Sequence, residues 1–258
     1  VLEEIKHLAA DVEIASMLDL GAGPGTALFA AKETFPELGY ATLLESDPSW
    51  LKMGERLAEH FDPAIEVTWT QSDLRRPLMV EEHDLVIMSY VLGELPQGAI
   101  ESIVRSAWKL ARKFLVIVEP GTTRGFATIN EVRSTLIAAG IAILAPCPHH
   151  NVCPMAVAGD WCHFAQRVER TSLHRQLKGG ELGFEDEKFS YVVAAREPRS
   201  TPAARIVRHP RKHSGHVQLT LCTAEGLKQT TVTKSQKSLY REARKAGWGD
   251  GWGVPSTE

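Results

Sequence analysis

A glycine-rich turn, GAGPG at residues 21–25, constrains the fold most, because it joins an apolar strand pattern to a helix pattern. The strand pattern covers residues 15–21, and the helix pattern begins at Thr26. Strand and helix patterns then alternate, with strands expected at 39–46, 65–70, 84–90, 113–120, 141–146 and 189–197, and helices at 1–12, 48–61, 101–112 and 126–140. This order predicts an α/β fold, a doubly wound and mainly parallel sheet with helices on both faces.

The same turn predicts a ligand site, because glycines adopt positive φ without a Cβ penalty and let the backbone approach a bound molecule. A nicotinamide dinucleotide site has the spacing GxGxxG, whereas the third glycine here, Gly25, comes too early, so hydride chemistry is the weaker enzyme interpretation. The spacing resembles the first motif of class I S-adenosylmethionine-dependent methyltransferases. That resemblance implies cofactor contacts from Asp19, Gly21, Ala22, Gly23, Pro24 and Gly25.

Two later carboxylates occupy positions that suit such a cofactor. Glu45 ends the second predicted strand, where it can accept hydrogen bonds from both ribose hydroxyls, and Asp73 follows the third, where it can accept one from the adenine amino group. Structural alternatives exist: Asp47 suits a cap for the helix that starts at Pro48, and Asp73 suits a turn. Together with the glycine turn, the order of these residues predicts S-adenosylmethionine binding.

The segment after the fourth predicted strand, residues 88–96, carries no recognisable catalytic motif. It lacks the Asn/Asp-Pro-Pro-aromatic arrangement of amino methyltransferases and a cysteine nucleophile, and the Pro146-Cys147 pair follows the sixth strand instead. Tyr90 and Glu94 are candidates for substrate contact, with a buried tyrosine and a helix-leading glutamate as the structural alternatives. No general base stands out, so catalytic residues stay unassigned and enzymatic activity stays open.

Four cysteines predict a metal centre. Cys147, Cys153 and Cys162 lie in one stretch rich in Pro and His, and Cys222 lies far downstream. A soluble intracellular chain rarely holds thiols as disulfides, and a metal would order the predicted irregular insertion at residues 146–188. By chemistry alone, a zinc ion and a [4Fe-4S] cluster are equally favoured, and His149, His150 or His163 could complete a zinc site. Buried cysteines without a metal are the third possibility.

Charge divides the chain into two parts. Residues 199–258 contain 11 Lys and Arg against 4 Asp and Glu, whereas residues 1–198 contain 18 against 28. We therefore predict a domain at 1–198 that includes the Cys-rich insertion, and a small, basic, β-rich C-terminal extension at 199–258 that supplies Cys222. A basic extension on an acidic body favours a nucleic acid partner over a merely solvated face.

Targeting signals and membrane spans are not recognisable in the sequence. It has no apolar run of 18 residues and no signal-peptide pattern, so a soluble intracellular protein with no membrane partner is expected. Because the chain opens at Val1 without an initiator Met, we also expect that a preceding part of the protein is missing from this sequence.

Five segments together resemble one family, the methyltransferase-like assembly factors of the small ribosomal subunit known from mitochondria and bacteria. The resemblance runs from Met17 to Trp252 and is carried by LDLGAGPGTA, DLVIMSYVLGELP, VIVEPGTTRGF, the CPH…CP…WCHFAQR block and PRKHSGHVQLTLC. It implies a class I methyltransferase fold, an S-adenosylmethionine pocket and association with small-subunit ribosomal RNA. It also implies a [4Fe-4S] cluster on Cys147, Cys153, Cys162 and Cys222.

The leading hypothesis is an iron-sulfur protein that binds S-adenosylmethionine and acts on the small ribosomal subunit. Its basic extension is expected to contact RNA phosphates through Arg205, Arg208, Arg211, Lys212 and Lys228. It is expected to be monomeric off the ribosome, in the cytoplasm if bacterial and in the mitochondrial matrix if eukaryotic. The alternatives are an active ribosomal RNA methyltransferase with the substrate base near Tyr90, an assembly factor without catalysis, and a zinc-stabilised methyltransferase with a non-ribosomal substrate.

Overall fold

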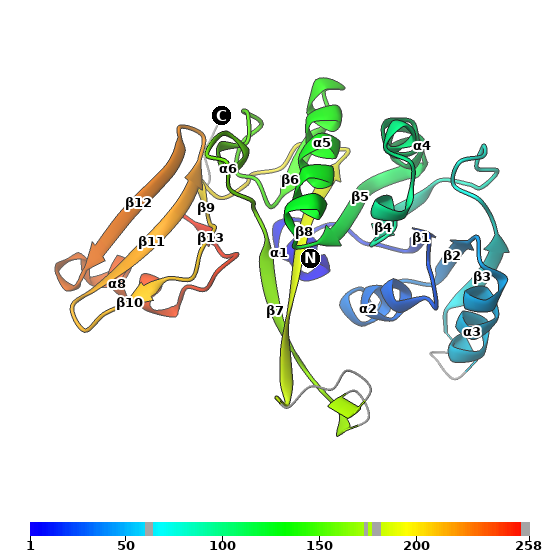
Figure 1. Ribbon diagram of the computed structural model, residues 1–258, viewed down its shortest axis with the longest axis horizontal. Helices are drawn as coiled ribbons and strands as arrows, with labels where there is room; N and C mark the ends of the chain where they lie inside the picture. The colour runs from blue at the N-terminus through cyan, green and yellow to red at the C-terminus, as the bar shows by residue number, and fades with distance from the viewer. Residues whose placement is uncertain (60–63, 173–174, 177–181, 254–258) are drawn as a thin grey trace.

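The computed structural model describes residues 1–59, 64–172, 175–176 and 182–253. Parts of three predicted segments lie outside the described residues: 60–61 of the helix at 48–61, 173–174 and 177–181 of the insertion, and 254–258 of the C-terminal extension. The described chain builds two β-sheets that lie side by side (Figure 1).

The larger sheet has the strand order β3-β2-β1-β4-β5-β8-β6, with β7 paired to β8. Strands β1 to β5 are parallel to one another, whereas β8 runs antiparallel to β5, β6 and β7. This is the class I methyltransferase arrangement that the sequence predicted. The strands are β1 (Ser16–Leu20), β2 (Tyr40–Glu45), β3 (Glu66–Gln71), β4 (His83–Ser89), β5 (Ala111–Pro120), β6 (Ala142–Ala145), β7 (Phe164–Glu169) and β8 (Phe184–Ala195).

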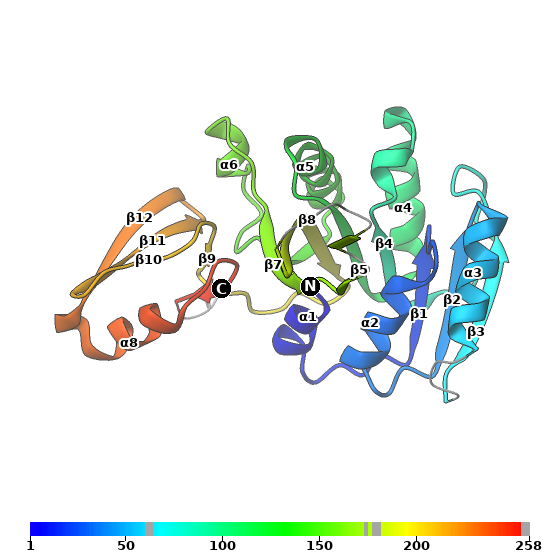
Figure 2. The same ribbon diagram turned by 60° about the horizontal axis from the view of Figure 1, so that its bottom comes forward.

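Helices cover both faces of this sheet (Figure 2). Leu28 and Met17 belong to the core under α1 and α2, whereas Leu18 and Val104 belong to a second core under α4 and α5. Alternate residues of the buried strands therefore fill opposite cores, as a doubly wound sheet requires. The helices are α1 (Leu2–Leu8), α2 (Thr26–Thr34), α3 (Pro48–Ala58), α4 (Ile100–Leu110) and α5 (Thr123–Ala138).

The Cys-rich insertion contains more regular structure than its sequence indicated. Helix α6 (Pro154–Val157) follows Cys153, and β7 pairs with the first half of β8, where Phe164 faces Phe189 and Glu169 faces Phe184. The prediction of an irregular segment through residue 188 was therefore wrong for these strands. Most of β7 is exposed and polar, so it lacks the buried face that produces apolar alternation.

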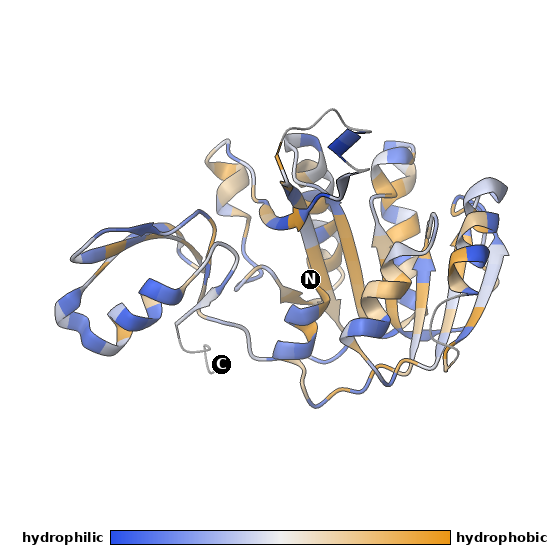
Figure 3. Ribbon diagram, turned by 90° about the horizontal axis from the view of Figure 1, so that it is seen from below, coloured by the Kyte–Doolittle hydropathy of each residue, from blue (hydrophilic) through white to orange (hydrophobic). Residues whose placement is uncertain are grey.

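The smaller sheet has the order β10-β11-β9-β13, with β12 paired to β11. Helix α8 packs on it and closes a separate core that includes Ile206, Leu219, Val232 and Ala243. Figure 3 shows α8 as mostly hydrophilic, in contrast to the apolar central strands of the larger sheet. The elements are β9 (Ala204–Ile206), β10 (Arg211–Lys212), β11 (His216–Thr223), β12 (Gly226–Thr233), α8 (Lys237–Lys245) and β13 (Gly251–Trp252).

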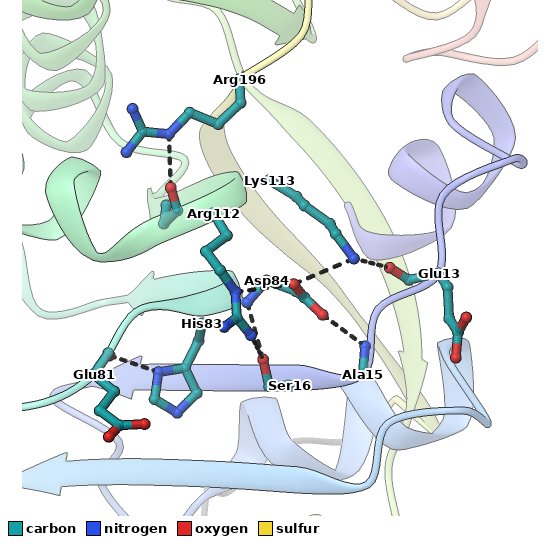
Figure 4. A network of polar contacts seen from close by, with 10 residues as sticks. Glu13, Ala15, Ser16, Glu81, His83, Asp84, Arg112, Lys113 and Arg196 are labelled. Atoms are coloured by element: carbon teal, nitrogen blue, oxygen red, sulfur yellow. Dashed lines mark hydrogen bonds and ion pairs between the residues drawn. The ribbon is translucent and has the colours of Figure 1, made fainter.

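A polar network fixes the amino ends of β1, β4 and β5 (Figure 4). The buried Asp84 carboxylate accepts a hydrogen bond from the Ala15 N–H at 3.0 Å and pairs with Arg112 and Lys113, each at 3.2 Å. The Arg112 guanidinium also donates to the Ser16 hydroxyl at 2.8 Å. With these ends fixed, the opposite, carboxyl ends of the same strands form the rim where ligands of such sheets bind. No helix in the described part of the chain is long and apolar enough to cross a membrane.

Candidate functional site

A pocket of about 1020 Å³ opens at the carboxyl ends of the parallel strands. Every cofactor residue predicted from sequence lines it except Gly25, which lies one residue before α2 as its N-cap. The turn depends on its glycines, since Gly21 has φ +79° and an added Cβ would lie 2.4 Å from Cγ2 of Val91. The lining residues predicted from sequence are Asp19, Gly21, Ala22, Gly23, Pro24, Glu45 and Asp73, together with Tyr90 and Glu94.

Asp19 brings an unpaired carboxylate to the wall of this pocket. It is 1% exposed, and neither carboxylate oxygen has a hydrogen-bond partner among the residues that the structure describes. Burial, and then the nearby negative charge of Glu45, raises the pKa of Asp19 to about 7. A buried acceptor of this kind is costly unless a donor or a cation reaches it.

Glu45 connects the second strand to the glycine turn. Its Oε2 accepts a hydrogen bond from the Gly23 N–H at 2.8 Å, and its Oε1 accepts one from the Asp47 N–H at 2.9 Å. These bonds leave further lone pairs on a carboxylate that lines the pocket. Asp47 acts as the helix cap that its sequence position indicated, because its Oδ1 accepts from the Ser49 N–H at 2.7 Å.

Asp73 lines the pocket from the loop after β3, and Arg75 already holds its carboxylate. The Arg75 guanidinium lies 2.6 Å from Oδ2, and the Arg75 backbone N–H donates to Oδ1 at 3.0 Å. Hydrogen bonds from the Arg75 side chain and backbone lower the pKa of Asp73 to about 2. Asp73 is therefore both a turn residue and a pocket residue, and it stays ionised across the physiological range.

Tyr90 and Glu94 lie on the loop that follows β4. Tyr90 has φ +58°, a left-handed conformation that costs a residue with a Cβ about 1–2 kcal/mol. Glu119, at the end of β5, supports this loop, since its buried Oε1 accepts from the Leu92 N–H at 2.9 Å. Sequence analysis missed Glu119, whose role depends on a contact 27 positions away. It also missed Trp50, which lines the pocket from α3.

The four cysteines line a second cavity, between the larger sheet and the smaller one. Cys147 follows β6, Cys153 precedes α6, Cys162 precedes β7, and Cys222 lies on β11. Phe126, Met155 and Phe164 also line this cavity, so the thiols meet in largely apolar surroundings. Burial raises the pKa of Cys147 and, together with the neighbouring thiols, raises that of Cys222 to about 12.

The histidines near these thiols have different surroundings. The His149 Nε2 lies 3.4 Å from the Cys222 sulfur, whereas the His150 Nε2 accepts a hydrogen bond from the Ile143 N–H at 3.0 Å. His163 stacks on Trp161 with ring centroids 5.2 Å apart. Among the described residues, no three His, Cys, Asp or Glu side chains are grouped as ligands of a single metal ion.

Comparison with known proteins assigns the family. The family model described as "Mitochondrial small ribosomal subunit Rsm22" matches residues 1–253, nearly the whole chain. The chain belongs to the Rsm22 family. This confirms the resemblance stated from the sequence motifs.

Two curated relatives show the same match. The chain is 28% identical over 302 residues to the "Rsm22-cox11 tandem protein 2, mitochondrial" of Schizosaccharomyces pombe, an alignment covering 97% of this chain and 40% of that protein. It is 28% identical over 257 residues to the human "Ribosome assembly protein METTL17, mitochondrial", covering 91% of this chain and 54% of that protein. The chain thus spans only about half the length of these curated relatives. Among solved structures, TehB from Haemophilus influenzae superposes with a TM-score of 0.49 at 13% identity, over 76% of this chain and 62% of that one.

In this Rsm22-family chain, the predicted basic residues are not equivalent. Arg205 is 2% exposed: its guanidinium pairs with Glu4 of α1 at 2.6 Å and donates to the carbonyl oxygens of Pro146 and Gly249. Arg208 is half-buried and pairs with Asp160. The expectation that Arg205 contacts RNA phosphates was wrong, because its guanidinium is buried and is bound by other parts of the chain. For Arg208, whose side chain is partly exposed, a phosphate contact stays a prediction. Exposed cations do lie on the smaller sheet and α8: Arg211, Lys212, Lys228, Lys234, Lys237, Arg241, Arg244 and Lys245.

Proposed function

We propose that the protein is an assembly factor of the small ribosomal subunit that binds S-adenosylmethionine, holds a [4Fe-4S] cluster and contacts ribosomal RNA. The family description and the printed name of the human relative support the ribosomal role. The names of both relatives support a mitochondrial location in a eukaryote, and a bacterial member would act in the cytoplasm. We keep the proposed division into residues 1–198 and 199–258, and a monomeric state off the ribosome.

The opposite charges of two separate surfaces carry this proposal. Carboxylates dominate the pocket of the larger sheet, with Arg75 as the arginine that lines it, whereas the smaller sheet and α8 present the exposed lysines and arginines. An acidic pocket attracts a cationic small molecule and repels an RNA backbone, and a basic surface does the reverse. The charges therefore favour RNA binding on the smaller sheet, away from the cofactor pocket. The pocket carboxylates are Glu3, Asp19, Glu45, Asp47, Asp73 and Glu94.

S-adenosylmethionine fits the pocket in charge and in donors. It carries an ammonium and a sulfonium, and when bound it supplies an activated methyl group. The unpaired, buried carboxylate of Asp19 suits the ammonium, and the free lone pairs of Glu45 suit the ribose hydroxyls. Asp73 is the proposed acceptor from the adenine amino group. The remaining contacts come from the glycine turn: Gly21, Ala22, Gly23, Pro24 and Gly25.

The four thiols that line the second cavity suit a [4Fe-4S] cluster, which the family resemblance favours over a zinc ion. Cys147, Cys153, Cys162 and Cys222 supply the four thiolates that such a cluster requires. When bound, the cluster supplies a cross-link between the Cys-rich insertion and β11.

Co-sedimentation with immature small ribosomal subunits tests the proposal that the smaller sheet and α8 bind ribosomal RNA. A variant with Arg211, Lys212 and Lys237 changed to Glu should bind more weakly. The slope of its salt dependence, measured between about 50 and 200 mM salt, should fall by roughly one unit for each phosphate that the variant no longer neutralises. The control changes three exposed lysines of the larger unit to Glu, namely Lys6, Lys52 and Lys109. Equal weakening in both variants, or none in either, would reject the proposed surface.

An active ribosomal RNA methyltransferase is the second candidate, favoured by the left-handed Tyr90 at the pocket. It predicts transfer of a labelled methyl group to immature subunits, abolished in Glu45→Gln. An assembly factor without catalysis binds the same particles and transfers nothing. A zinc-stabilised methyltransferase with a non-ribosomal substrate, the third candidate, predicts one zinc per chain and no affinity for the particles.

A further inference from the structure

Arg133 of α5 is a buried cation beside the four-cysteine cavity. Its side chain is 4% exposed, and it lines the cavity together with the thiols. Its Nε donates to the Cys147 sulfur at 3.2 Å, and one terminal nitrogen donates to the carbonyl oxygens of His149 and Asn151 at 2.7 and 2.9 Å. One guanidinium thus contacts a thiol and holds the loop that follows it.

The charge of Arg133 lacks a carboxylate partner in the described part of the chain. Arg205, which donates to the carbonyl of Pro146 next to Cys147, is also buried and has Glu4 at 2.6 Å. Burying a guanidinium without an anion is strongly unfavourable, and carbonyl oxygens supply only partial negative charge. Something near Arg133 must therefore carry negative charge, and the nearest group that can is the thiol of Cys147.

Protonated thiols do not balance this cation. A protonated thiol is neutral, so the contact between the Arg133 Nε and the Cys147 sulfur balances the guanidinium charge only when that sulfur is a thiolate. A metal bound by four thiolates removes the protons and leaves a net anion, because four thiolates outweigh the positive charge of Zn²⁺ or of an oxidised [4Fe-4S] core. Hydrogen bonds to the sulfurs and nearby charge are the features through which a protein tunes such a centre.

We infer that Arg133 is the counter-charge of the four-cysteine centre, a positioning residue that stabilises its anionic, metal-bound state. This inference rests on the proposed function, since it requires a metal on the four thiolates. One added electron makes the centre more negative, so Arg133 stabilises a reduced cluster more than an oxidised one. Removing its charge lowers the reduction potential and weakens metal retention.

The test compares full-length Arg133→Met and Arg133→Lys with the wild-type protein, all purified without oxygen. For an iron centre, titration with dithionite should show Arg133→Met at least tenfold harder to reduce, a shift of about 59 mV for a one-electron couple. Arg133→Lys keeps the charge and should stay within about threefold of wild type. For a zinc centre, the measurement is metal transfer to a competing chelator. Arg133→Met should then bind the metal at least tenfold more weakly than wild type, and Arg133→Lys should stay within about threefold.

Arg196→Met is the control, because the Arg196 guanidinium also donates to backbone carbonyls, those of Trp108, Lys109 and Ala111, and does not line the cysteine cavity. It should leave the potential unchanged. If Arg133→Met behaves like this control, or if Arg133→Lys shifts the potential as much as Arg133→Met, the inference is wrong. A wild-type protein without bound metal would instead reject the proposed function on which it rests.

Discussion

Asp19 destabilises the folded protein at neutral pH, because folding removes its carboxylate from water without providing a partner. Its pKa rises from 3.8 to about 7, so the folded state binds a proton more tightly than the unfolded state does. The penalty is absent below about pH 4 and complete above about pH 7, where it reaches about 4 kcal/mol. A residue kept at such a cost at a pocket wall indicates a ligand that needs its charge.

Asp19→Asn should raise the free energy of unfolding by about 2 kcal/mol at pH 8 and change it little at pH 4, because the amide keeps a polar burial cost but no charge. Urea unfolding at both pH values measures this. The same variant should bind S-adenosylmethionine at least tenfold more weakly by calorimetry. A variant that loses stability at pH 8, or binds as tightly as wild type, would show that Asp19 has another role.

Helix α5 runs from the end of β5 along the four-cysteine cavity. Its N-terminus begins at the end of β5, where the Thr122 hydroxyl accepts a hydrogen bond from the Gly125 N–H at 3.0 Å. Only glycine fits at position 125, since an added Cβ would lie 2.0 Å from the Pro120 carbonyl oxygen. Two turns further on, the helix carries Arg133 to the thiols. The cap therefore sets the position of a residue that we place beside the metal centre.

Thr122→Ala should lower the free energy of unfolding by about 1 kcal/mol, because it leaves a helix N–H without its acceptor. Ser134→Ala is the control on the same helix: Ser134 is exposed and its hydroxyl donates within the helix to the Asn130 carbonyl, so removing it should change stability by less than about 0.5 kcal/mol. Thermal or urea unfolding of both variants gives the comparison. Equal changes in stability in both variants would show that the Thr122 cap does not stabilise α5.

At the scale of the whole molecule, polar contacts and a small apolar cluster join the two sheets, with Val207 and Cys222 packed against Phe126, Cys153 and Met155. Arg205 of β9 joins α1, the loop before Cys147 and the loop at Gly249, and the Asn151 side chain donates to the Ala224 carbonyl at 2.9 Å. The larger sheet and the smaller one have separate cores. A metal on the four thiolates would add the strongest link, because Cys222 comes from the smaller sheet.

Removing the metal with a chelator should therefore loosen the smaller sheet first. Hydrogen exchange should rise in β9, β11 and β12, whereas β1, β4 and β5 stay protected by their own core. Cys222→Ser should reproduce the pattern without a chelator. Unchanged exchange in β11, or an equal rise across both sheets, would contradict a metal link between them.

Sequence patterns predicted those elements whose residues form a continuous apolar run and are also buried. The strands β1, β2, β4 and β5 are buried apolar runs, and the structure has them within about three residues of the predicted ends. The missed strands β7, β9, β10 and β13 are short or largely exposed, so no period marks them. Helix α8 was also missed, although Leu239, Tyr240 and Ala243 give it an apolar side. Arg205 was placed on the RNA surface because its charge was visible in the sequence, whereas its burial depends on Glu4, about 200 positions away.

The sequence by itself determined the doubly wound sheet, the glycine turn and the family, since each depends on the type and spacing of neighbouring residues. Tertiary structure alone decided that Asp19 lacks a partner, that Arg75 holds Asp73, that Arg205 is internal and that Arg133 contacts Cys147. These facts depend on which groups meet after folding and on how much water remains around them. The sequence gives the type of a charged residue but not whether its side chain is solvated, paired or buried. Only the folded chain distinguishes these three states.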